Sequence, residues 1–294
     1  MRTPTSLSLA VAAFLTAAAA HAQPVFVSTG APDGRFGSSS NPSGGGIIEH
    51  ETGDDFILTQ HTRVTAASFW GLLPAGLGTS GINAFTVEIY RVFPFDSDVS
   101  RTSGPPTFST PQVPTRVNSP SDVALDSRDL ASGLSLNAQL LGAFSVANTV
   151  VNGIHPQPGN NTGGEGSASG DEVLLQASFT TPFDLAAGHY FIVPQVGLTN
   201  GNWLWLSAAK PIVGGTPFSP DLQSWIRDAN LDPDWLRIGT DIVGGTPAPT
   251  FNLAFSLAGV TIAEPASMAL LAGGLGALAF LRRRSAGSRK PDAT

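Results

Sequence analysis

The chain has 294 residues, of which 13% are charged, and it contains no cysteine. The lack of cysteine excludes a disulfide scaffold, a thiolate zinc site and a cysteine nucleophile. When the two ends discussed below are set aside, residues 23–263 keep nine of the 15 basic and 20 of the 22 acidic residues, a formal charge near −11. A body this acidic is not expected to bind a polyanion, so we predict no nucleic-acid partner.

The N-terminus has the three parts of a secretory signal peptide. Arg2 supplies a positive charge, an apolar run follows from Leu7 to Ala20, and Ala20-His21-Ala22 forms an A-x-A cleavage site. Such a segment directs export and is then removed. We therefore predict a signal peptide over residues 1–22, cleaved after Ala22. The alternative is a buried N-terminal helix.

Residues 23–46 are predicted to form a flexible N-terminal arm, because Gly, Ser, Asn and Pro dominate from residue 30 onward. Short β-branched and aromatic runs then recur between turn signals throughout 47–262. The clearest alternates in Phe85–Phe93, which places Phe85, Val87 and Ile89 on one face of a strand and Glu88 and Tyr90 on the other.

This pattern predicts an all-β domain over 47–262, a jelly-roll-like β-sandwich with a long insertion at 96–133. A mixed topology and two smaller sandwiches remain alternatives. One short helix is expected from Ser219-Pro220-Asp221 through Asp228, because a cap residue precedes Pro and an acid. Trp225 and Trp235 are expected to pack on it. The stretch at 53–71, GDDFILTQHTRVTAASFWG, resembles the opening of β-sandwich modules in bacterial secreted proteins.

The C-terminal segment, 263–294, reads as an anchor. An apolar run of 16 residues extends from Ala266 to Leu281, and Arg282-Arg283-Arg284 follows it. A helix of this length spans about 24 Å, so it is short for a ~30 Å hydrocarbon core. Basic residues after it favour a cytoplasmic tail and an exported body. We predict a transmembrane helix here.

Glu264-Pro265, the Gly-rich apolar run and the Arg cluster together resemble a PEP-CTERM sorting signal, although Ala263 stands where that family has its first Pro. The resemblance implies an exosortase-like membrane peptidase and the inner membrane as partners. It also implies a Gram-negative host that makes exopolysaccharide, with the protein ending at the cell surface or in the matrix. A plain single-span anchor is the alternative.

Trp203 and Trp205 are two residues apart, so on a strand they share one face. Paired indoles on one face can stack on sugar rings, which makes them candidate glycan-stacking residues. The alternative is that both lie in the core, as paired tryptophans on a strand usually do.

Acidic loops offer oxygen ligands at Asp96, Asp98, Asp232 and Asp234. Clustered loop carboxylates suit a hard cation, so a structural calcium ion is a hypothesis for these loops. Solvated acidic turns are the alternative, and no other cofactor is expected.

No catalytic motif is present: G-x-S-x-G is missing, and the adjacent Asp54 and Asp55 should point to opposite faces of a strand. We therefore predict a non-enzymatic exported envelope or matrix protein that binds exopolysaccharide. The alternatives are a secreted polysaccharide hydrolase and a purely structural matrix protein.

Overall fold

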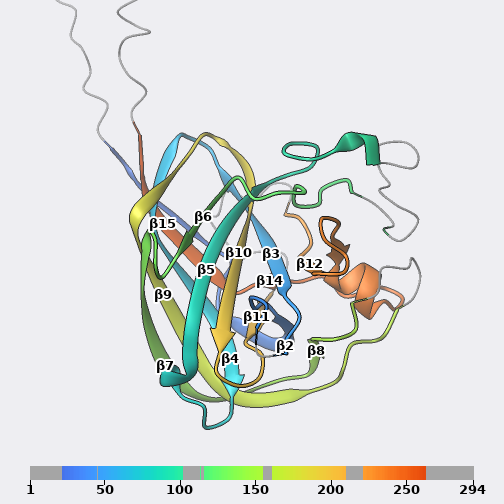
Figure 1. The fold of residues 1–294 in the computed structure, drawn as a ribbon. Helices are drawn as coiled ribbons and strands as arrows, with labels where there is room; N and C mark the ends of the chain where they lie inside the picture. The colour runs from blue at the N-terminus through green and yellow to red at the C-terminus, as the bar shows by residue number, and fades with distance from the viewer. Residues whose placement is uncertain are drawn as a thin grey trace, which may run out of the picture. The chain divides into compact units, whose positions relative to one another are not determined.

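The computed structural model describes residues 22–44, 46–101, 113, 116–154, 161–209 and 221–262. This part of the chain is all-β, as predicted, and its strands form two sheets (Figure 1). Ala22 is exposed at the start of the described residues. Residues 1–21 of the predicted signal peptide, Ala20 among them, lie outside the described residues, as do Glu264, Pro265 and the whole predicted anchor. No helix in the described ranges is long and apolar enough to cross a membrane.

The first sheet has nine strands. Its main order is β1-β15-β4-β11-β2-β8, with β14 paired to β11, β9 to β4, and β7 to β9. The bounds are β1 Pro24–Ser28, β2 Pro32–Ser39, β4 Thr62–Pro74, β7 Leu134–Val146, β8 Asn148–Val150, β9 Ala168–Leu185, β11 Leu204–Ala208, β14 Asn252–Leu253 and β15 Phe255–Thr261.

The second sheet has six strands in the order β13-β12-β3-β10-β5-β6. They are β3 His50–Leu58, β5 Ile82–Arg91, β6 Asp126–Asp129, β10 Gly188–Leu198, β12 Trp225–Asp228 and β13 Leu236–Arg237. Three short helical segments, η1 Thr79–Gly81, η2 Val99–Arg101 and the π-helical η3 Ile238–Val243, complete the described elements.

The main core lies between the two sheets and follows from alternation. On β5, Phe85, Val87 and Ile89 are buried in this core, while Tyr90 belongs to a different apolar cluster. The alternation predicted for 85–93 is therefore confirmed. Phe69 of β4 meets Phe85 edge to face across the sheets, with ring centroids 6.0 Å apart, an arrangement that aromatic pairs prefer.

The prediction of a flexible arm at 23–46 is wrong for β1 and β2. β1 pairs with β15, and β2 lies between β11 and β8. The Gly and Ser residues of β2 serve close packing instead of mobility. A Cβ built on Gly37 would stand 3.2 Å from the Cβ of Leu204, and Ser38 and Ser39 are fully buried. Small side chains let this strand enter a crowded sheet.

The helix predicted up to Asp228 is also wrong. Ser219 and Pro220 lie outside the described residues, and Trp225–Asp228 is strand β12, paired antiparallel with β3. Neighbouring side chains alternate between the two faces, as in a strand: Ile226 enters the main core, whereas Trp225 faces the other side of the second sheet. There it shares an apolar cluster with Trp235, whose ring meets Tyr90 edge to face at 5.4 Å. The two tryptophans thus pack on a sheet.

The strands of the sandwich run between two ends, and residues 23 and 261 lie together at one of them. Gln23 and Thr261 lie side by side, because each backbone N–H bonds to the other residue, both at 2.8 Å. We call this the terminal end. At the other end, Pro74 of β4 pairs with Gly170 of β9, and Leu198 of β10 pairs with Ile82 of β5. β4 runs from one end to the other, and its 13 residues span about 40 Å. We call the second end the distal end.

Candidate binding site

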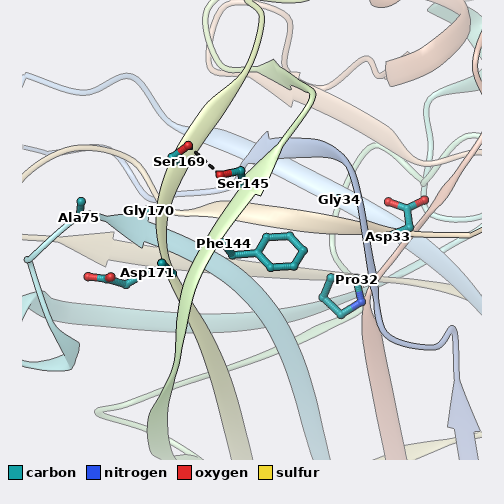
Figure 2. Close-up of a pocket in the computed structure, with 10 residues that line it drawn as sticks. Pro32, Asp33, Gly34, Ala75, Phe144, Ser145, Ser169, Gly170 and Asp171 are labelled. Atoms are coloured by element: carbon teal, nitrogen blue, oxygen red, sulfur yellow. Dashed lines mark hydrogen bonds between the residues drawn. The ribbon is translucent and has the colours of Figure 1, made fainter.

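A hollow at the distal end surrounds the ring of Phe144 (Figure 2). Its volume is about 590 Å³, and it opens to solvent. We call it the Phe144 pocket. Its lining comes from the start of β2, the end of β7, the start of β9 and the residue after β4: Pro32, Asp33, Gly34, Ala75, Ala143, Phe144, Ser145, Ser169, Gly170 and Asp171.

The register of β7 places Phe144 in this hollow. Phe144 pairs with Gly170 on β9, so its cross-strand neighbour has no side chain to cover the ring. Gly34 adopts φ +71°, and a Cβ built there would stand 3.9 Å from Cζ of Phe144. Behind the ring, Leu72 and Leu204 belong to an apolar cluster on the outer face of the first sheet. The ring is therefore held from behind and left partly exposed.

Two carboxylates lie on opposite sides of this ring (Figure 2). Oδ2 of Asp171 accepts the N–H of Gly76 at 2.8 Å, and Oδ1 of Asp33 accepts the N–H of Arg35 at 3.0 Å. Oδ2 of Asp33 has no hydrogen-bond partner within the described residues. This oxygen is buried, and Oδ1 also accepts the hydroxyl of Ser207, so a ligand hydroxyl reaches Oδ2 only when the carboxylate rotates and its existing bonds shift.

A pair of hydroxyls completes the polar lining. The Oγ atoms of Ser145 and Ser169 are 2.8 Å apart and exposed (Figure 2). Hydroxyls donate and accept, and no basic side chain is among the ten that line the pocket. An apolar ring between carboxylates and hydroxyls suits a neutral polyol, while the two negative charges disfavour an acidic ligand.

The predicted glycan-stacking residues lie elsewhere. Trp203 and Trp205 do share a face, and their rings stack at 6.4 Å, but neither has any exposed surface. Nε1 of Trp205 donates to the carbonyl of Ala254 at 2.9 Å. These indoles belong to the main core, so the stacking face predicted for them is wrong and the core alternative is confirmed.

The acidic loops predicted for calcium do come close together. Arg101 donates to Oδ1 of Asp234 at 2.9 Å and lies 3.0 Å from Oδ1 of Asp122. The N–H of Asp98 donates to the other oxygen of Asp122 at 2.8 Å. Arginine side chains therefore carry the positive charge between these loops.

Each of the four candidate ligands has a partner: Asp96 with Arg91, Asp98 with Ser100, Asp232 with Arg227 and Asp234 with Arg101. Within the described ranges, no group of three or more His, Asp or Glu side chains is placed to hold a metal ion. A calcium ion in these loops stays a prediction.

Sequence patterns did not reveal a buried polar cluster on the outer face of the second sheet. The hydroxyl of Tyr90 lies 2.7 Å from Oε1 of Glu51 and 2.8 Å from Oε2 of Glu88. Arg227 pairs with Glu51 and donates to the Tyr90 hydroxyl at 3.0 Å, and its guanidinium lies 4.4 Å from the centroid of the Trp235 ring. Glu51, Tyr90 and Arg227 are buried and line none of the described hollows. Arg227 also donates to the carbonyls of Asp122 and Pro233, so the cluster ties two loops to the sheet.

Glu88 gives this cluster a pH dependence. Its burial and the neighbouring charge of Glu51 raise the pKa of Glu88 to about 7. The unfolded chain loses this proton near pH 4.5, whereas the folded chain keeps it until about pH 7. The free energy of unfolding should therefore fall as the pH rises between these values. Glu88→Gln mimics the protonated acid. We expect the free energy of unfolding of this variant, relative to the wild type, to be higher at pH 8 than at pH 4.5 by on the order of 2 kcal/mol.

Chemical denaturation at the two pH values measures this difference. Glu49→Gln is the matched control, because Glu49 lies just before β3 and accepts a hydrogen bond from Gln195 at 2.9 Å that a glutamine can also accept. Equal pH profiles for the wild type and Glu88→Gln would contradict the assignment of the proton to Glu88.

Asp54 and Asp55 point to opposite faces of β3, as predicted. Oδ2 of Asp54 accepts the N–H of Leu253 at 2.7 Å inside the sandwich. Oδ2 of Asp55 lies 2.6 Å from Nε2 of His189, and its Oδ1 accepts the N–H of Leu222. The two carboxylates thus cannot act on one substrate.

No family model matches this chain, and neither a curated protein nor a solved structure matches it.

Proposed function

We propose that this chain is an exported, non-enzymatic protein whose jelly-roll-like β-sandwich binds neutral polysaccharide in the Phe144 pocket. One observation carries the proposal: a partly exposed aromatic ring stands between two carboxylates, with two hydroxyls beside it. The C–H face of a sugar packs on an aromatic ring, and its hydroxyls donate to carboxylates. The alternation of the chain between the two sheets, with β2, β4, β9 and β11 in one and β3, β5, β10 and β12 in the other, supports the jelly-roll-like description.

Export and anchoring belong to the same proposal. The signal peptide over 1–22, the exosortase-like peptidase that would act near Glu264-Pro265, and the inner membrane come from sequence patterns and the PEP-CTERM resemblance. The position of Gln23 beside Thr261 supports them, because it puts both junctions at the terminal end of the body. The Phe144 pocket lies at the distal end, where a matrix polymer can reach it.

Loss of the ring should weaken binding. We expect Phe144→Ala to lower affinity for a neutral polysaccharide about tenfold, equivalent to ~1.4 kcal/mol. The measurement is affinity electrophoresis of the full-length chain in mild detergent, with dextran, a β-1,3-glucan and a galactomannan as neutral polymers and alginate as the acidic one. Phe26→Ala is the matched control, because Phe26 is 68% exposed and lies near the terminal end.

The outcomes separate the three classes of function. Binding of alginate alone, or equal binding by Phe144→Ala and the wild type, would contradict the site. Release of reducing ends from a bound polymer would identify a hydrolase. Self-association without binding to any polymer would favour a structural matrix protein.

A further inference from the structure

A second hollow at the distal end has a different lining. Its volume is about 480 Å³, and it lies where β5 begins and β10 ends. Its polar residues are neutral amides and hydroxyls, among them Asn83, Asn200, Asn202, Ser43 and Thr199, and none of its 13 lining residues is charged. We call it the amide pocket. Planar amides and hydroxyls donate and accept at once, as sugar hydroxyls do.

Three of the four amides that line this pocket make no hydrogen bond within the fold, whereas the fourth, Asn41, donates to the carbonyls of Pro42 and Ile48. The side chains of Asn83, Asn200 and Asn202 form no hydrogen bond to any described residue, and Oδ1 of Asn202 is buried without a partner. A buried amide oxygen without a partner carries an energetic cost. Rotating the Asn202 amide toward a bound hydroxyl would break no existing bond and would satisfy this oxygen.

The two pockets are neighbours. Gly201 lines the amide pocket, and a Cβ built on it would stand 2.9 Å from Cγ of Pro74. Ala75, the next residue, lines the Phe144 pocket. Gly201 also adopts φ +76°, a conformation that glycine tolerates best. Pro74 therefore connects the two linings, because it lies beside Gly201 of the amide pocket and directly precedes Ala75 of the Phe144 pocket.

We propose that the amide pocket is a second subsite for the same neutral polysaccharide, so that the protein binds an internal stretch of the polymer across the distal end. This inference rests on the proposed function. Two adjacent subsites on one chain convert the second contact into an intramolecular event, so affinity rises with ligand length beyond that of either subsite. Short oligosaccharides should fill the Phe144 pocket alone.

A length series tests the inference. The probes are oligosaccharides of increasing length prepared from whichever of the three neutral polymers binds the full-length protein, titrated by calorimetry. We expect Asn202→Ala and Asn200→Ala each to weaken binding of the longest oligosaccharides about tenfold, with less than a twofold change for the shortest. Asn137→Ala is the matched control, because Asn137 is exposed on β7 outside both pockets.

Each outcome decides the inference. Equal loss for short and long oligosaccharides, or no loss with either variant, would overturn the second subsite while leaving the Phe144 pocket intact. Failure of every polymer to bind the wild type would overturn both proposals together. Asn200 is exposed and unbonded, so Asn200→Ala should fold even if the substitution at the less exposed Asn202 disturbs the loop.

Discussion

Replacing Gly71 by alanine should destabilise the protein by at least about 3 kcal/mol. Gly71 is buried in β4 and pairs with Trp205 of β11. A Cβ on Gly71 would stand 1.8 Å from Nε1 of Trp203, within the ring itself. Trp203 is fully buried and cannot move aside without breaking its stacking on Trp205. Overpacking of a rigid core costs 1–3 kcal/mol or more, and this overlap is severe.

Denaturant unfolding of Gly71→Ala measures the effect, with Gly53→Ala as the matched control. Gly53 also lies within a strand, but the one tight contact of a Cβ there would be with Cγ2 of Val193, at 3.1 Å, and its next contacts are ordinary ones at 3.8 Å. The control should lose about 1 kcal/mol or less, because a side-chain tip can yield by a few tenths of an ångström. Equal stability of the two variants would show that the indole of Trp203 is not fixed where the structure places it.

Removal of the guanidinium at Arg227 should be the second large effect. Arg227→Met leaves Glu51 and Glu88 as two buried carboxyls without their positive partner and removes the bond to the Tyr90 hydroxyl. Breaking one side of a buried ion pair costs about 3–5 kcal/mol. We expect a loss in that range at pH 8, measured by denaturant unfolding. The loss should be smaller at pH 5, because the pKa of Glu88 is raised to about 7 and its carboxyl is then protonated and uncharged.

Arg63→Met is the control for this change. Arg63 pairs with Asp184 at 2.8 Å, and both side chains are about half exposed, so its loss should cost far less stability than the loss of Arg227, because solvent screens an exposed pair. A loss at Arg227 no larger than the loss at Arg63 would mean that solvent already reaches the Glu51 cluster.

Local alternation predicted the faces of strands well. It placed Phe85, Val87 and Ile89 together, and it separated Asp54 from Asp55. Alternation cannot tell which face will be covered, because that depends on the rest of the sheet. Trp203 and Trp205 show this limit: they share a face as predicted, yet that face is the inside of the sandwich.

Composition was a poorer guide than alternation. The Gly- and Ser-rich β2 reads as a loop by itself, and it becomes a strand because small residues fit between β11 and β8. Asp33 lies in this strand, so one wall of the Phe144 pocket is built from a segment whose composition is typical of a loop. The sequence signal for Phe144 is the Phe-Ser pair near the end of the run Leu134–Val146. Its cross-strand partner Gly170 cannot be predicted in this way, because strand pairing joins segments that are distant in the sequence.

Residue spacing in the sequence does not predict ion pairs between distant loops either, because tertiary contacts decide which charged side chains meet. The sequence predicts Asp98 and Asp234 as oxygen ligands because each lies in an acidic turn. Their arginine environment depends on Arg101 and Asp122, which the fold brings beside Asp234 from another loop. An acidic cluster in the sequence therefore does not reveal which basic side chains the fold places beside it.

The position of the C-terminal strand has a mechanical consequence. β15 runs antiparallel between β1 and β4 and reaches the terminal end at Thr261, while both pockets lie at the far end of β4. A polymer pulling on the distal end against a fixed C-terminus would apply force along β15. Hydrogen bonds of an antiparallel ladder lie perpendicular to the strands, so this force shears the ladder and loads its bonds together. Pulling across the strands would instead open them one at a time, so in the proposed anchored and polymer-bound protein this orientation would resist drag.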